Sequence, residues 1–179
     1  MKGRLRSFTH AAMALMGITV SFLSHGAYDN MVINFIGTVK TAACNVSGTS
    51  NQTVPLGNIS TTVFSNAGDV SPASPFSIML NCPPDGPARA TVTFSGRAAS
   101  DPTLLALDIG DGVATGVAVR INEDDNTTQV KLNASSASTA LVAGVNTLRF
   151  MAQYQALVAR PKISSGVANA TAQFTVNYP

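Results

Sequence analysis

Two cysteines, Cys44 and Cys82, are the residues of this 179-residue chain whose chemistry is easiest to specify. In an oxidising compartment a disulfide is the expected state of such a pair. Closing a loop of this length stabilises a fold by about 4 kcal/mol in the chain-entropy model. A pair of buried free thiols or a redox pair is the alternative, and the absence of a C-x-x-C spacing argues against the redox pair.

The N-terminus decides which other chemistry the chain could use. A basic start, an apolar run and small residues follow one another in residues 1–10, 11–23 and 24–27. This order is typical of a secretory signal peptide, which we assign to residues 1–26; cleavage after Gly26 or after Ala27 fits equally well. The apolar run is too short to cross a bilayer, which takes about 20 residues. We therefore expect export, without direct membrane insertion.

Removing the signal changes the charge and removes every imidazole. The formal net charge of the whole chain is +2, whereas the remainder has eight basic and nine acidic side chains, a net charge of −1. Both histidines, His10 and His25, leave with the signal. Histidine-dependent nucleophilic catalysis and the usual zinc sites are thereby excluded, and nothing marks a nucleic-acid partner.

Carboxylate and lysine chemistry remains, but no motif supports it. Lys40, Lys131 and Lys162 are not placed beside a nucleophile by any recognisable spacing. The acidic residues near 108–111 and 123–125 do not follow the ligand spacing of a calcium loop. We expect no enzymatic activity, no metal site and no cofactor.

The sequence pattern predicts that the exported chain is built of β-strands. Short β-rich runs alternate with turn material, and no helical period of apolar residues is sustained after residue 23. About eight strands in roughly 150 residues predict a Greek-key sandwich of immunoglobulin-like type. Residues 104–107 fit a short strand or one helical turn equally well. The predicted strands are 31–40, 52–56, 76–81, 90–95, 117–122, 129–132, 147–155 and 170–178.

The first and last of these strands carry apolar faces that call for a partner. In the first, one face is formed by Met31, Ile33, Phe35, Gly37 and Val39. In the last, Phe174, Val176 and Tyr178 alternate with polar residues, and the sequence ends at Pro179. An exposed apolar edge strand tends to pair with another chain. Alternatively, the first strand of the same chain covers it.

At these residues the chain resembles the type 1 pilin family, the fimbrial subunits of the bacterial chaperone-usher pathway. The likeness spans essentially the whole exported chain, and its motifs occur in the family's order. They are IGTV at 36–39, AAC at 42–44, VPLG at 54–57, PFSI at 75–78, LNCP at 80–83, VTFSG at 92–96, LLAL at 104–107, GVAVRI at 116–121, FMAQY at 150–154 and the ending 168–179.

The resemblance implies an incomplete sandwich that lacks its last strand and is completed by a donor strand from another chain. Residues 27–40 would be the donor extension, with the apolar face given above, and residues 41–179 the pilin domain. Gly37 would fit a shallow pocket of the acceptor groove; without the family it reads equally as a strand bulge. Phe174, Val176 and Tyr178 would line the groove, and a periplasmic chaperone would hold the carboxylate of Pro179.

The implied function is structural. The chain would pass through the periplasm, meet a chaperone and an outer-membrane usher, and join neighbouring subunits in an adhesive fimbrium on the bacterial surface. The short stretch before Cys44 resembles that of minor or adaptor subunits, and a donor segment together with an open last strand indicates an internal position. The rival interpretation is a secreted sandwich that completes itself and binds carbohydrate or protein, in which 27–40 would lie on its own domain.

Overall fold

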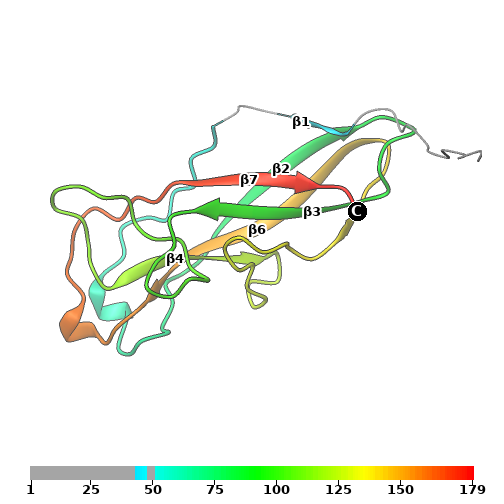
Figure 1. Cartoon of the computed structure of the whole chain (residues 1–179). Coiled ribbons are helices and arrows are strands. Elements are labelled where there is room, and N and C mark those ends of the chain that lie inside the picture. The colour runs from blue at the N-terminus through cyan, green and yellow to red at the C-terminus, as the bar shows by residue number, and fades with distance from the viewer. Residues whose placement is uncertain (1–42, 48–50) are drawn as a thin grey trace, which may run out of the picture. The chain divides into compact units, whose positions relative to one another are not determined.

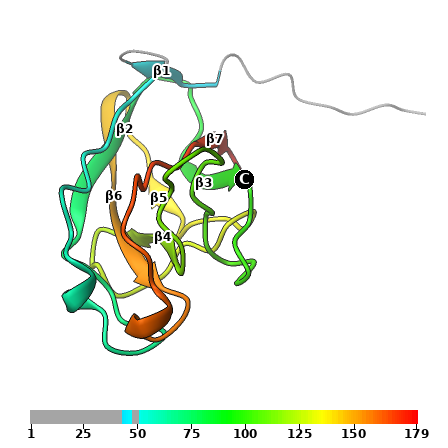
Figure 2. The same cartoon turned by 90° about the vertical axis from the view of Figure 1, so that its left-hand side faces the viewer.

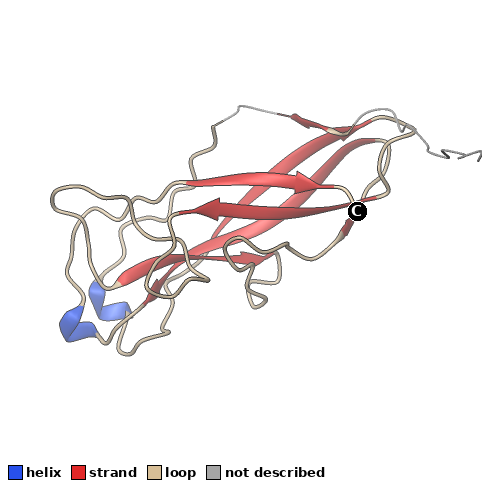
Figure 3. Cartoon of the chain, in the orientation of Figure 1, coloured by secondary structure: helices blue, strands red, loops and turns tan. Residues whose placement is uncertain are grey.

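The computed structural model describes residues 43–47 and 51–179, and within these ranges the regular structure is β apart from two short 3-10 turns (Figures 1 and 3). The predicted signal, the extension 27–40 and the first predicted strand lie outside the described residues. The strands are β1 (Asn45–Ser47), β2 (Ser74–Cys82), β3 (Arg89–Gly96), β4 (Val117–Glu123), β5 (Thr139–Ala140), β6 (Gly144–Ala156) and β7 (Ala172–Asn177). The turns are η1 (Thr61–Val63) and η2 (Arg160–Lys162).

The strands form two antiparallel sheets that face each other. One sheet has the order β1-β2-β6-β4 and the other β5-β3-β7. Figure 2 shows β2 and β6 on one side of the sandwich and β3 and β7 on the other. This arrangement confirms the all-β, immunoglobulin-like fold class predicted from the sequence. In the described part of the chain, no helix is long and apolar enough to span a membrane.

Alternation with a period of two explains why the central strands form where they do. In β3, Ala90, Val92 and Phe94 are buried while the residues between them face outward. Phe94 meets Phe150 of β6 edge to face, with ring centroids 5.1 Å apart, and Phe76 of β2 lies within 6 Å of both rings. These contacts hold the two sheets together at the centre of the sandwich.

Two predicted strands are wrong. Residues 52–56 form no strand, because Pro55 lacks an N–H and the flanking Val54 and Leu56 cover the core as a loop. Residues 129–132 form only an isolated bridge between Gln129 and β4. Their backbone N–H groups donate to different segments, so no continuous ladder develops; Val130 donates to Ile121 and Leu132 to Thr103.

Other elements were not predicted or were left open. The short strands β1 and β5 were not predicted, since two or three residues carry no periodicity. The undecided stretch 104–107 is neither a named strand nor a helix; Leu105 bridges to Ala98 on one side and to Val119 of β4 on the other. This stretch therefore joins β4 to the segment that follows β3.

Candidate functional site

Strand β7 presents apolar side chains at an open edge. Among the described strands it pairs with β3 alone. Phe174 and Val176 lie opposite Phe94 and Val92, so they face the same interior as those buried residues. Yet Phe174 is 37% exposed and Val176 is only half-buried. Within the described residues, the inner face of β7 is therefore less covered than the rest of the core.

Strand β1 shows the same feature on the other sheet. Within the described residues it pairs with β2 alone. Val46 lies opposite Leu80, which is fully buried, but Val46 itself is 50% exposed. Sequence reasoning missed Val46, although a two-residue step from Cys44 would have placed it on the inner face.

The end of β7 and the start of β1 are tied together at the disulfide. The bridge between Cys44 and Cys82 is formed, which confirms the oxidised pair expected from the sequence. The Tyr178 hydroxyl donates to the Cys44 carbonyl oxygen at 3.3 Å. Burial raises the pKa of Tyr178 above its usual value. The two open edges, one from each sheet, thus converge at this end.

The start of β7 is held by Asp108. Its Oδ1 accepts from the Thr171 N–H at 3.2 Å and its Oδ2 accepts from the Thr171 hydroxyl at 3.0 Å. The Asp108 N–H in turn donates to the Asn169 carbonyl at 2.7 Å. Hydrogen bonds therefore fix β7 at both ends, while the side chains of Phe174 and Val176 between them remain partly open. Nothing in the sequence pattern singled out Asp108 for this role.

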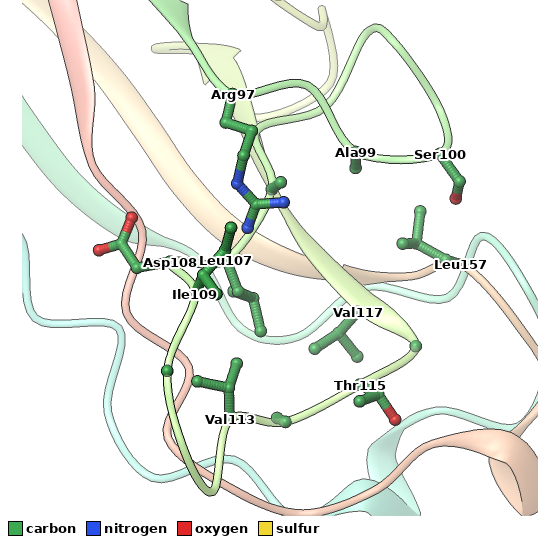
Figure 4. A pocket seen from close by; sticks show the side chains of 14 residues that line it. Arg97, Ala99, Ser100, Leu107, Asp108, Ile109, Val113, Thr115, Val117 and Leu157 are labelled. Atoms are coloured by element: carbon green, nitrogen blue, oxygen red, sulfur yellow. The ribbon is translucent and has the colours of Figure 1, made fainter.

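A pocket of about 390 Å³ adjoins the same start of β7 (Figure 4). Its apolar lining includes Leu107, Ile109, Val113 and Val117. Figure 4 shows the Asp108 carboxylate turned toward β7, away from Val117. Ile109 is 87% exposed, which is unusual for so large an apolar side chain.

The acidic stretch 123–125 has a local structural explanation. Asp125 accepts hydrogen bonds from the N–H groups of Thr127 and Thr128 and from the Thr128 hydroxyl. These bonds lower the pKa of Asp125 to about 2, with the Thr128 hydroxyl contributing most. The carboxylate closes the turn after β4. Over residues 43–47 and 51–179, no three His, Cys, Asp or Glu side chains gather in a way that could hold a metal ion.

The structure brings the described site residues from the sequence together. Phe174, Val176 and Tyr178 occupy one face of β7 and its end, and Pro179 follows them, exposed. Val176 and Tyr178 pack against the core cluster that contains Cys44 and Cys82. The donor face from Met31 to Val39 lies outside the described residues.

Comparison with known proteins gives a consistent result. The fimbrial protein family matches residues 33–179. The type-1 fimbrial protein A chain of Salmonella typhi is 44% identical over 152 residues, covering 82% of this chain and 81% of that protein. The probable major fimbrial subunit LpfA of Escherichia coli O157:H7 is 34% identical, covering 96% and 94%. The crystal structure of a Burkholderia pseudomallei antigen and type I fimbria protein superposes with a TM-score of 0.58 at 32% identity, covering 75% of this chain and 88% of that one.

Proposed function

This chain belongs to the fimbrial protein family, and we propose that it polymerises by donor-strand exchange as an internal subunit of a type 1-like fimbria. It is a structural pilus subunit and not an enzyme. In the proposed exchange, residues 27–40 of one copy add a strand to the domain 41–179 of the next. The added strand would lie along β7 and fill the incomplete sandwich.

The observation that carries the proposal is the open apolar edge of β7. Phe174 and Val176 face the interior but remain partly exposed, and Val46 does the same on β1. A strand that alternates Met31, Ile33, Phe35, Gly37 and Val39 has the period needed to fill such an edge. Each large apolar side chain that becomes fully buried contributes about 1.5 to 3 kcal/mol. Backbone hydrogen bonds along the free edge add direction and register.

The proposed partners follow from the same edge. Before assembly, a periplasmic chaperone would cover β7 and contact Phe174, Val176, Tyr178 and Pro179. An outer-membrane usher would then deliver the subunit to the growing fibre, where the donor strand of a neighbour replaces the chaperone. The disulfide between Cys44 and Cys82 fits passage through an oxidising compartment after removal of residues 1–26. The fibre would support adhesion at the bacterial surface.

The position in the fibre has two candidates. A short extension before Cys44 favours a minor or adaptor subunit. The likeness to a protein named as a probable major fimbrial subunit favours the rod itself. Quantitative mass spectrometry of fibres sheared from producing cells separates them, because a rod subunit outnumbers every other subunit and an adaptor is present in a small, fixed number.

Strand donation is tested with a chain that can accept a strand but cannot donate one. The exported chain, residues 27–179, with Gly37→Arg serves as acceptor, because a bulky residue at 37 prevents its own strand from seating. We expect a peptide of residues 27–40 to raise its melting temperature and its resistance to protease. The same peptide with Gly37→Arg is the matched control and should do neither.

If the wild-type peptide changes neither the melting temperature nor the proteolysis of the acceptor, strand donation is the wrong account. A wild-type chain that stays monomeric and does not bind the peptide would instead support the self-completed binding module.

A further inference from the structure

We propose that the pocket at the start of β7 is a contact surface for a second copy of this chain, namely the end of the donating copy that carries its disulfide. The inference rests on the proposed strand donation and adds a body-to-body contact to it. The pocket end is defined by Asp108, Ile109 and Val113. The disulfide end is defined by the Cys44–Cys82 bridge and the exposed Val142 and Val145.

The two ends lie at opposite ends of β7. Asp108 lines the pocket and binds Thr171, immediately before the strand begins. Tyr178, immediately after the strand ends, binds Cys44. In Figure 1 the arrow of β7 runs from the loops of the pocket end toward the C-terminus.

The direction of a donated strand determines which end of the acceptor meets the donor. Every named strand pair in both sheets is antiparallel. Antiparallel pairing is also slightly more stable per residue than parallel pairing. A donor strand antiparallel to β7 places Val39, its last face residue, at the start of β7, beside the pocket.

The tether between the donor strand and its own domain is short. Val39 and Cys44 are joined by a few residues that extend to about 18 Å at most. The disulfide end of the donating copy must therefore lie close to the pocket end of the accepting copy. Strand donation in this direction brings these two surfaces together whether or not they attract each other.

Both surfaces expose large apolar side chains. At the pocket end, Ile109 is 87% exposed and Val167, bridged to Val113, is 53% exposed. At the disulfide end, Val142 is 67% exposed and Val145 is 68% exposed.

Two contacts place these valines beside the disulfide. Val145 lies opposite Asn81. The Asn146 amide donates to the Val142 carbonyl at 2.8 Å and contacts the Cys82 sulfur at 3.4 Å. Apolar surface that is exposed in one copy but faces apolar surface of the next is typical of an interface.

The partner that meets the pocket is a second copy of the chain, because each donated strand brings the disulfide end of its own copy to the pocket through the same short tether. The contact is head to tail: one surface patch meets a different patch on the next copy, and such a contact builds an open fibre when its rotation does not close into a ring. Such a contact repeats along a fibre. It would limit the angle between successive domains and slow the separation of each joint.

The experiment compares two donors on one acceptor. The acceptor is the exported chain with Gly37→Arg, with or without Ile109→Glu. One donor is the exported chain with Val176→Asp, which keeps its own strand but accepts none; Phe174→Arg replaces it if that variant fails to fold. The other donor is the peptide 27–40, which carries the strand without the disulfide end. Dissociation of each labelled donor is followed after dilution into excess unlabelled peptide.

We expect Ile109→Glu to speed dissociation of the full-chain donor about tenfold and to leave the peptide donor unchanged. Val145→Glu in the full-chain donor should have a similar effect on the unmodified acceptor. Val63→Glu, at an exposed valine of η1 outside the pocket lining, is the matched control and should change neither donor.

Each other outcome overturns the inference. Equal acceleration of peptide and full chain would make Ile109 part of the strand groove. No acceleration of either would leave the pocket without a role in the joint, whatever else binds there. If the peptide does not bind even the acceptor without Ile109→Glu, strand donation itself is refuted. This outcome distinguishes the two proposals.

Discussion

Strands β6 and β7 carry the same kind of residue in the same pattern, yet one forms core and the other an open edge. Phe150 of β6 lies opposite Phe76, and Phe174 of β7 lies opposite Phe94. Phe150 is 2% exposed and Phe174 is 37% exposed. The difference is the number of neighbours: β6 lies between β2 and β4, whereas β7 pairs with β3 alone among the described strands. At Phe150 a paired strand lies on each side and the ring is buried, whereas at Phe174 a paired strand lies on one side and the ring stays partly exposed.

A tyrosine in β6 and one just beyond β7 make similar hydrogen bonds. Tyr154 of β6 donates to the Ala168 carbonyl at 2.8 Å, and Tyr178 beyond β7 donates to the Cys44 carbonyl at 3.3 Å. Burial raises the pKa of both hydroxyls. The ends of the open strand are thus held by the same chemistry as the closed sheet, and what distinguishes β7 is the partial exposure of its middle.

Truncating the two phenylalanines gives the largest expected effect. Phe150→Ala should lower the free energy of unfolding by about 4 kcal/mol, because it opens a cavity in a closed core. Phe174→Ala should cost about 1 to 2 kcal/mol, because much of its ring is already exposed. Urea unfolding of the exported chain measures both. Equal losses would mean that β7 is as closed as β6.

Adding the donor peptide should sharpen the contrast. We expect Phe174→Ala to weaken binding of the peptide 27–40 at least tenfold, because the ring becomes fully buried only in the complex. Thr175→Ala, on the outward face of the same strand, is the control and should leave the affinity nearly unchanged. Calorimetric titration provides the measurement, and similar affinities for the two variants would place the bound peptide elsewhere.

The tyrosine hydroxyls should contribute less. Tyr178→Phe and Tyr154→Phe each remove one hydrogen bond and should each cost about 1 kcal/mol of unfolding free energy. Only Tyr178→Phe should also increase hydrogen exchange at the end of β7. Unchanged exchange there would show that the bond to Cys44 does not hold the strand end.

The smallest effect is the pH dependence at alkaline pH. Folding favours the neutral form of Tyr154 and Tyr178, whose pKa values are raised above the usual 10.0. Their contribution to stability is present below pH 10 and is lost as the pH rises through the raised pKa values. The unfolding free energy should fall in that range, and less steeply in the Tyr154→Phe, Tyr178→Phe double variant. An unchanged slope would mean that neither hydroxyl is linked to folding.

Much of the sandwich was predictable because most of its strands alternate apolar and polar residues along the sequence. The patterns around Val92, Phe94 and Phe150 predicted β3 and β6, and β2, β4 and β7 were predicted in the same way within a few residues of their ends. The disulfide was predictable because export fixes the redox state of two cysteines. The apolar face of Phe174, Val176 and Tyr178 was equally visible.

Several features of the site were not predictable, because they depend on which distant segments lie side by side. Alternation suggested strands at 52–56 and 129–132. The N–H groups of 129–132 donate to separate segments of the chain, and Pro55 has no N–H to donate, so neither stretch forms a ladder. Asp108 became an anchor only when the fold brought it to Thr171, 63 residues away. Val46 was overlooked because its strand, β1, is three residues long.

The sequence by itself determined the fold class, the oxidised cysteine pair and which residues of the last strand form its apolar face. The reason is that an export signal and a two-residue alternation can both be recognised from residues that are close together along the chain. Only the tertiary structure decided that alternating apolar residues become buried at Phe150 of β6 but stay partly exposed at Phe174 of β7, and that a pocket lies where β7 begins. Burial is a property of neighbours, and neighbours are set by strand order across the sheets.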